Sequence, residues 1–235
     1  MKKGHTEDHS LSTGARLRDI ILGGQDGLVN VLGVILAVAS ATLDPRIVIV
    51  AGIAATLAES ISMAAVAYTS SRAVESHYKS QLEKEKKEIE NLPKAEKEEI
   101  YEIFYNKGFR GTLLNAIVSR ITSNKNLWLR TMMEEELHLY PSRTSPLYDA
   151  VVVGISAIIG SLVPLVSFFF LAINQAIVFS LISSVVVLFV TGYIKNKITI
   201  GSPWKGGLEM AVIGMAAALI GYAIGSFLGV ALYLH

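Results

Sequence analysis

The sequence has no cysteine, few prolines and little charge. Its 235 residues include no Cys, 6 Pro and 17% charged residues. The absence of cysteine excludes disulfide frameworks, thiolate metal sites and cysteine nucleophiles. The 21 basic and 20 acidic residues nearly balance, and aromatic residues do not alternate with the basic ones, which gives no support to nucleic-acid binding. No phosphate-binding loop motif occurs, so the common ATP-driven classes are excluded as well.

Apolar residues are abundant and unevenly distributed. Hydrophobic residues make up 51% of the sequence, and the mean hydropathy is +0.47. Of the 20 acidic residues, 11 lie between positions 83 and 136, while several long windows are almost free of charge. This segregation excludes an ordinary soluble domain. It predicts an all-α, polytopic membrane protein with one polar insert.

Five apolar runs are long enough to cross a bilayer, which takes about 20 helical residues. The predicted spans are 20–41, 47–69, 148–171, 175–194 and 208–234. The first is not expected to be a cleavable signal peptide, because Asp26 lies inside it and a short turn leads directly into the second. The predicted organisation is an N-terminal segment (1–19), two spans (20–70), a helical insert (71–147) and three further spans (148–235).

The basic residues predict the orientation of the spans. Four of them precede span one: Lys2, Lys3, Arg16 and Arg18. Only Arg46 lies in a loop on the opposite side of the bilayer. The positive-inside rule therefore predicts that the N-terminus, the insert and the loop between spans four and five are cytoplasmic, with the C-terminal Leu234 and His235 outside. The compact loops favour a prokaryotic cell membrane, with a vacuolar membrane as the eukaryotic alternative.

Two carboxylates lie well inside predicted spans, where an ionisable side chain costs about 3 kcal/mol or more and is a functional candidate by default. Asp26 lies in span one, with Asn30 at i+4 on the same face. Glu59 lies near the middle of span two, with Met63 at i+4. A carboxylate beside a thioether suits a borderline cation such as Fe²⁺ better than Ca²⁺ or Mg²⁺. Carboxylates alone fit a proton relay equally well, and Met63 alone fits ordinary helix packing.

The insert is predicted to form helices at about 72–91, 94–106 and 112–139, with a break near Ser123. Acids and methionines recur on these helices at spacings of three or four, which place side chains on one face. The candidate ligands are Glu85, Glu88, Glu96, Glu99, Met132, Met133 and Glu136. Such a set suits transition-metal binding. The lysines interleaved among the acids leave open the alternative of a solvated, ion-paired helix surface.

Two short motifs are Asp26-Gly27-Leu28-Val29-Asn30 and Ser62-Met63-Ala64, in a chain with five spans and a Glu-rich insert after the second. These motifs and the order of the spans resemble the vacuolar iron transporter family. The resemblance implies a homodimer, not an enzyme, that exports Fe²⁺ and in some cases Mn²⁺ from the cytoplasm in exchange for protons. It implies a translocation path near the dimer axis that uses Asp26 and Met63. It also implies that the candidate ligands of the insert bind Fe²⁺, with Mn²⁺, Zn²⁺ and Co²⁺ as further ions, and that no separate cofactor is required.

The sequence departs from this family at one carboxylate. The family motif usually continues Ser-Met-Ala-x-Gly-Glu-Tyr, whereas Ala67 stands at the glutamate position here. Glu59, two helical turns earlier, is the candidate replacement. The alternative function is a membrane-anchored ferroxidase or ferritin-like iron store, which would require two Glu-x-x-His motifs. The sequence contains one, at Glu135 and His138.

Overall fold

The structure is a computed structural model that describes residues 11–142, 144–199 and 201–233. Lys2, Lys3, Leu234 and His235, which bear on the predicted orientation, lie outside the described residues. The regular structure of the described residues is entirely helical. The chain divides into two compact units: a membrane unit formed by the chain up to Tyr68 and from Pro146 onward, and an insert unit formed by Thr69–Ser145.

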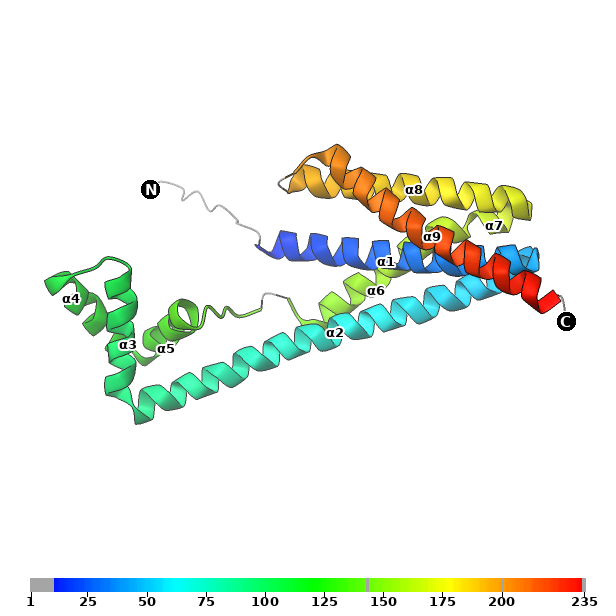
Figure 1. The fold of residues 1–235 in the computed structure, drawn as a ribbon. Helices are drawn as coiled ribbons and strands as arrows, with labels where there is room; N and C mark the ends of the chain where they lie inside the picture. Colours follow the sequence, from blue (N-terminus) through cyan, green and yellow to red (C-terminus); the bar gives the residue numbers. More distant parts are fainter. Residues whose placement is uncertain (1–10, 143, 200, 234–235) are drawn as a thin grey trace, which may run out of the picture. The chain divides into compact units, whose positions relative to one another are not determined.

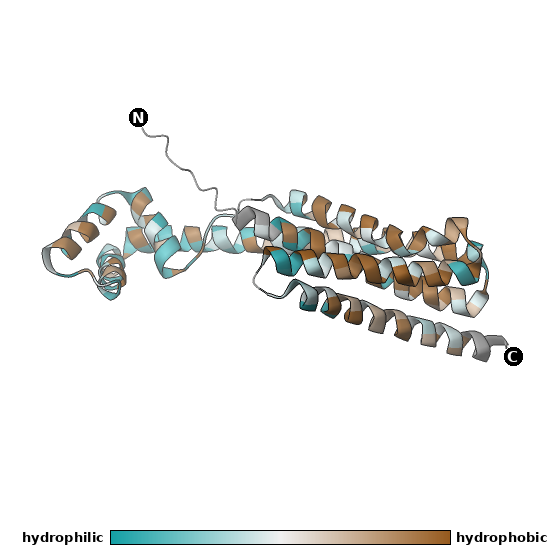
Figure 2. Cartoon of the chain, turned by 90° about the horizontal axis from the view of Figure 1, so that it is seen from above, coloured by the Kyte–Doolittle hydropathy of each residue, from teal (hydrophilic) through white to brown (hydrophobic). Residues whose placement is uncertain are grey.

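Five helices are long and apolar enough to cross a membrane. They are α1 (Leu11–Thr42), α2 (Pro45–Asn91), α6 (Pro146–Leu165), α8 (Ile173–Ile198) and α9 (Pro203–Tyr233). Figure 2 shows apolar residues along these helices and more hydrophilic residues on the helices of the insert. The predicted all-α class with five long apolar helices is confirmed.

The third predicted span differs from the structure. Instead of one helix over 148–171, the chain forms α6, which ends at Leu165, and the short α7 (Ser167–Phe170). Pro164 lies inside α6 one residue before its end, and its nitrogen cannot donate a hydrogen bond to the preceding turn, which weakens the helix at this point. The Ser167 hydroxyl donates to the carbonyl oxygens of Pro164 and Ala176, at 3.2 and 3.0 Å. These bonds join the interrupted helix to α8.

The central helix of the membrane unit is α1, which packs against α6, α8 and α9 (Figure 1). Glycines allow the backbones to approach closely. A Cβ atom on Gly27 would lie 2.3 Å from the carbonyl oxygen of Ala157 in α6, and one on Gly225 of α9 would lie 2.1 Å from that of Ala37. The small-residue motifs of these helices therefore make contacts inside the chain, as tight helix packing in lipid requires.

The insert unit consists of the end of α2 and the elements that follow it. They are α3 (Pro93–Asn106), α4 (Gly111–Thr122), α5 (Lys125–Thr131) and a π-helical turn (Met132–Glu136). α3 begins at a proline, which is favourable in the first helical turn because its missing N–H would have no partner there. Asn124 separates α4 from α5, and its side chain accepts hydrogen bonds from the backbone N–H groups of Asn126 and Leu127, at 3.0 and 3.1 Å. This cap explains the predicted break near Ser123.

We expect Gly27→Ala to destabilise the membrane unit, because the new methyl group would meet the backbone of α6 at 2.3 Å. Overpacking of this kind costs about 1–3 kcal/mol. Gly33→Ala is the matched control on the same helix, since a Cβ atom there meets nothing within 4 Å. Thermal unfolding of the purified protein in detergent should show a lower melting temperature for Gly27→Ala alone. Equal melting temperatures would contradict the packing role of Gly27.

Candidate functional site

The membrane unit brings together three of the four residues predicted to form a transport path. The Glu59 carboxyl group of α2 lies close enough to the side chains of Asp26 and Asn30 of α1 to interact with both. The spacing of four residues places Asp26 and Asn30 on one face of α1, so both reach the same carboxyl group. Asp26 and Glu59 are half-buried and Asn30 is exposed in the single chain. The cluster of Asp26, Asn30 and Glu59 is hereafter called the membrane cluster.

The turn of α2 that carries Glu59 is held by hydroxyl groups on both sides. Thr56 donates to the carbonyl oxygen of Gly52 at 2.8 Å, and Ser60 donates to that of Thr56 at 2.6 Å, both in buried surroundings. These bonds satisfy the hydroxyl groups within the helix, so neither competes for the Glu59 carboxyl group. Glu59 is thus left as the group on this turn that faces α1.

Two other positions on α2, Met63 and Ala67, follow Glu59 at intervals of one helical turn. Met63 is half-buried at i+4 from Glu59, so it is associated with the cluster by its place on the helix. Ala67 lies one turn further along and is also half-buried. Its methyl group can neither bind a cation nor carry a proton, so Glu59 is the carboxylate that α2 contributes to the cluster.

Two neighbouring carboxyl groups in an apolar setting have the chemistry to exchange a proton for a cation. They can form a hydrogen bond to each other only when one of them carries a proton, because ionised carboxylates only accept hydrogen bonds. If that proton leaves, two negative charges face each other in an apolar setting, and a divalent cation would neutralise them. Cation binding at such a pair is therefore linked to proton release.

Five predicted ligands of the insert unit interact through their charges. They are Glu85 and Glu88 of α2, Glu96 and Glu99 of α3, and Glu136 of the π-helical turn. The side chains of Glu99 and Glu136 are also hydrogen-bonded to each other. Residues 85 and 136 are far apart in the sequence, so it is the fold of the insert unit that gathers them. These five residues are hereafter called the insert cluster.

Two members of the insert cluster are deeply buried. Glu85 is 3% exposed and Glu96 is 5% exposed, and one carboxyl oxygen of each, Oε2, has no hydrogen-bond partner in the described part of the chain. Burial, followed by repulsion from neighbouring carboxylates, raises the pKa of Glu85 and of Glu96 to about 7. Partial loss of solvent around its carboxyl group and then the charge of Glu99 raise the pKa of Glu136 as well, although this residue as a whole is exposed. Unpaired buried acceptors beside further carboxylates are groups that a cation would stabilise.

The methionines occupy a different environment from the one that α-helical spacing predicts. Met132 is fully buried in the apolar core of the insert unit, where it packs with residues such as Ile100 and Trp128. Met133 is 1% exposed, whereas Glu136 is exposed. The π-helical turn inserts an extra residue, with the Leu137 N–H bonded to the Met132 carbonyl at 3.2 Å, and thereby changes the face relation expected at i,i+4. The hydrophobic periodicity of the sequence contains no signal for this turn.

The carboxylates of the insert cluster lie near one another but do not form a closed shell of metal ligands. Among the described residues, no three Asp, Glu or His side chains converge closely enough to hold a metal ion. Some acids take part in surface ion pairs instead, as the alternative interpretation expected: Glu88 lies 3.5 Å from Lys84, and Glu90 lies 3.6 Å from Lys125. The carboxylates of the insert cluster are therefore close enough to influence one another's charge without converging on one point.

The chain is similar to known proteins along most of its length. Residues 17–226 match the sequence profile of the VIT family. The chain belongs to the VIT family. It is 33% identical over 222 residues to vacuolar iron transporter 1 of Tulipa gesneriana, with 94% of this chain and 90% of that protein covered. Vacuolar iron transporter 1 of Arabidopsis thaliana is 31% identical, with coverages of 94% and 88%.

The relatives extend beyond plants. The vacuolar iron transporter of Plasmodium falciparum is 30% identical over 232 residues, with 94% of this chain and 85% of that protein covered. The resemblance inferred from the Asp26 and Met63 motifs is therefore confirmed, as are the predictions of a multi-pass membrane protein and of a transporter rather than an enzyme.

For this VIT-family chain we expect the metal-free insert unit to be less stable at pH 8 than at pH 5.5. Glu85 and Glu96 have raised pKa values in the folded state, so their stabilising contribution is present below about 4.5 and is lost as the pH rises through about 7. A fall of roughly 5 °C in melting temperature is expected over this range.

The buried Trp128 reports on the insert unit, and Trp204→Phe makes it the sole tryptophan, since the sequence has two. Melting should be followed by Trp128 fluorescence in the presence of a chelator. The double variant Glu85→Gln, Glu96→Gln should show a much weaker pH dependence. A melting temperature of the parent protein that rises from pH 5.5 to 8 would contradict the prediction.

Proposed function

We propose that the chain transports Fe²⁺ out of the cytoplasm in exchange for protons. The observation that carries this proposal is the proximity of Glu59 to Asp26 and Asn30 within the membrane unit of a VIT-family protein. The names of its relatives, vacuolar iron transporters, support iron as the cargo. Carboxylates with a nearby thioether also suit Mn²⁺, Co²⁺ and Zn²⁺, which we expect to compete with Fe²⁺.

The proposed exchange uses the proton between the two carboxyl groups. A metal ion that reaches Asp26 and Glu59 displaces this proton, and return of a proton from the other side releases the ion. Glu59 then performs the role of the family glutamate that Ala67 replaces. Since the chain has no nucleotide-binding motif, the proton gradient is the proposed source of energy.

We propose a homodimer whose two copies meet along α1 and α2. In the single chain Asn30 is exposed, and so are large apolar side chains of α2 such as Leu57 and Ile61. A polar cluster open to lipid would be costly, and a second copy placed over it would exclude the lipid. The resemblance implies the same arrangement, with the path near the dimer axis.

We propose that the insert unit captures cytoplasmic metal ions for the path. The two unpaired oxygens of Glu85 and Glu96, and the repulsion within the insert cluster, support a site that draws together when a cation binds. This assignment follows the predicted topology, with the N-terminus and the insert in the cytoplasm and the C-terminus outside. The prokaryotic cell membrane stays a prediction, beside the vacuolar location that the relatives' names indicate.

The alternative of a ferroxidase or ferritin-like store receives less support. Glu135 of the single Glu-x-x-His motif forms an ion pair with Lys107. His138 follows the π-helical turn with a left-handed backbone, φ 52°. The two side chains therefore do not belong to a continuous α-helix, as the di-iron motif requires.

Transport by the purified protein in sealed liposomes with a fluorescent metal reporter tests the proposal. Asp26→Ala and Asp26→Asn should both abolish Fe²⁺ flux, since the second keeps the shape of the side chain but removes its charge. Glu59→Gln should allow metal flux without the matching pH change. Glu209→Gln is the control, because it removes an exposed carboxylate on α9.

The replacement role of Glu59 has its own test. Ala67→Glu introduced into Glu59→Gln restores the carboxylate at the family position and should restore proton coupling. Wild-type flux from Asp26→Asn, or unchanged coupling in Glu59→Gln, would contradict the proposed path.

The insert unit is tested by two double variants with equal changes of charge. Glu96→Gln with Glu99→Gln should weaken Fe²⁺ or Mn²⁺ binding, measured by calorimetry on the whole protein, by roughly tenfold or more. Glu83→Gln with Glu90→Gln should have little effect, because both side chains are exposed. In liposomes the first pair should slow transport at low metal concentration only. Equal losses of binding in both pairs would show that the acids form a solvated surface.

A further inference from the structure

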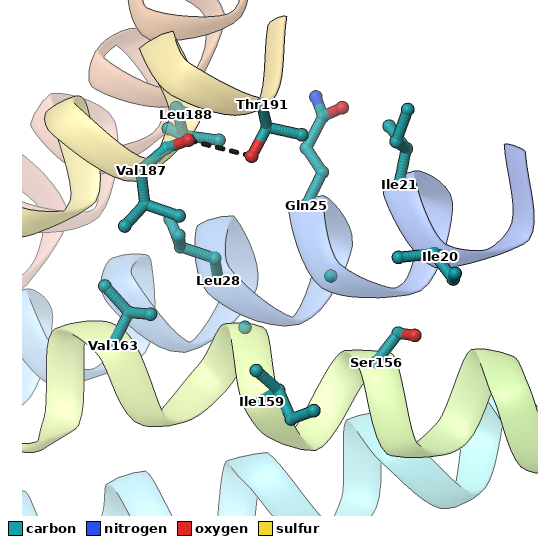
Figure 3. Close-up of a pocket in the computed structure, with 12 residues that line it drawn as sticks. Ile20, Ile21, Gln25, Leu28, Ser156, Ile159, Val163, Val187, Leu188 and Thr191 are labelled. Carbon is teal, nitrogen blue, oxygen red and sulfur yellow. Dashed lines mark hydrogen bonds between the residues drawn. The ribbon is translucent and has the colours of Figure 1, made fainter. Parts of the chain in front are cut away.

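A cavity of about 200 Å³ lies where α1, α6 and α8 meet in the membrane unit. Its walls include Leu28 of α1, Ile159 and Val163 of α6, and Leu188 of α8 (Figure 3). It also opens to the outside of the helix bundle, since Ile159 is 62% exposed. None of the three residues of the membrane cluster lines this cavity. An apolar cavity of this kind, open towards the bilayer, is a place for a hydrocarbon chain.

Two polar side chains lie towards one end of the cavity, next to the apolar Ile20 and Ile21. Gln25 of α1 and Thr191 of α8 lie beside each other there (Figure 3). The Thr191 hydroxyl donates to the carbonyl oxygen of Val187 at 2.8 Å, so its hydrogen-bonding need is met within α8. The Gln25 amide remains directed to the end of the cavity, where it can meet the polar part of a bound molecule.

Basic residues lie beyond this end of the cavity. α1 and α8 run in opposite directions, because Leu28 packs against Leu188 while Gln25 and Thr191 share the next level. Continuing in the same sense, Lys195 lies one turn beyond Thr191 on α8, and Arg18 lies two turns before Gln25 on α1. Arg18 is paired with Asp19 at 3.2 Å, yet its side chain remains 79% exposed. Basic residues therefore follow the cavity on both helices, outside its lining.

Aromatic residues indicate that this end lies at the surface of the bilayer. The rings of Tyr193 and Trp204 meet edge to face with centroids 5.7 Å apart, and Trp204 is 69% exposed. Tyr193 is two residues before Lys195 on α8. Tyr and Trp are enriched where a membrane-spanning helix passes the lipid headgroups. Lys195 is thus at the level of the headgroups, and the apolar cavity lies nearer to the centre of the bilayer.

We propose that the cavity binds one acyl chain of an anionic phospholipid, whose phosphate group is held by Lys195 and Arg18. The surrounding bilayer supplies the lipid, and the change from apolar lining to basic rim matches the change from chain to headgroup. Basic pockets between membrane helices at the cytoplasmic surface recognise anionic lipids in this way. The bound lipid would join α1, α6 and α8 and stabilise the position of α1.

The test is lipid binding to the detergent-purified full-length chain, measured by native mass spectrometry with added phosphatidylglycerol or phosphatidylcholine. We expect one phosphatidylglycerol per chain, bound more tightly than phosphatidylcholine. Lys195→Gln should reduce this preference by about fivefold, the effect of one basic residue near the membrane surface. Lys197→Gln is the matched control, because it removes the same charge from a different face of α8.

Thr191→Phe fills the cavity and should reduce the binding of both lipids, with a melting curve to verify folding. If this variant does not fold, a competition experiment on the wild-type protein tests the cavity instead. Lysophosphatidylglycerol should displace the bound lipid, whereas glycerol 3-phosphate, which has no chain, should not. Displacement by glycerol 3-phosphate would overturn the proposal of a chain-binding cavity.

Three further outcomes would overturn the proposal. One is equal binding of phosphatidylglycerol and phosphatidylcholine, and another is an equal effect of Lys195→Gln and Lys197→Gln. The third is a disulfide between two copies of Ile159→Cys, which would show that a second copy covers the cavity. The chain has no other cysteine, so such a crosslink has one interpretation. Ile61→Cys on α2 is the comparison, because the proposed dimer should crosslink there.

Discussion

The close approach of α1 to its neighbours is the constraint on which the membrane unit depends. At Gly27 and Gly225 the backbones of adjacent helices come so near that a methyl group would not fit. Without a hydrophobic driving force between helices in lipid, such backbone contacts supply much of the packing energy. They also fix the rotation of α1, which turns Asp26 and Asn30 towards Glu59 and Gln25 towards the cavity shared with α6 and α8.

Both clusters place carboxylates where the surroundings disfavour negative charge. In the membrane cluster a proton on either Asp26 or Glu59 would remove one of the two charges and allow a hydrogen bond between them. In the insert cluster the raised pKa values of Glu85 and Glu96, about 7, have the same origin. A metal ion can replace the proton in either place, so metal and proton compete for the same oxygens. This competition is the physical basis of the proposed exchange.

Much of both clusters could be predicted from residue type and spacing. Depth in an apolar run singled out Asp26 and Glu59, and the contact between them followed from the fold. The methionines were less accessible to this reasoning, because the π-helical turn changes the relation of Met132 to Glu136 and places Met132 in the apolar core. Hydrophobic periodicity does not reveal a single extra residue in one turn, because the formation of a π-helical turn depends on how that turn packs.

The sequence by itself determined the helical class, the five apolar helices, the insert and the family, because these depend on composition, run length and short motifs. The tertiary structure alone decided which faces meet. It showed which backbones Gly27 and Gly225 approach, and that α1, α6 and α8 enclose a cavity. Such features depend on contacts between residues distant in sequence, and local propensity carries no information about their distances.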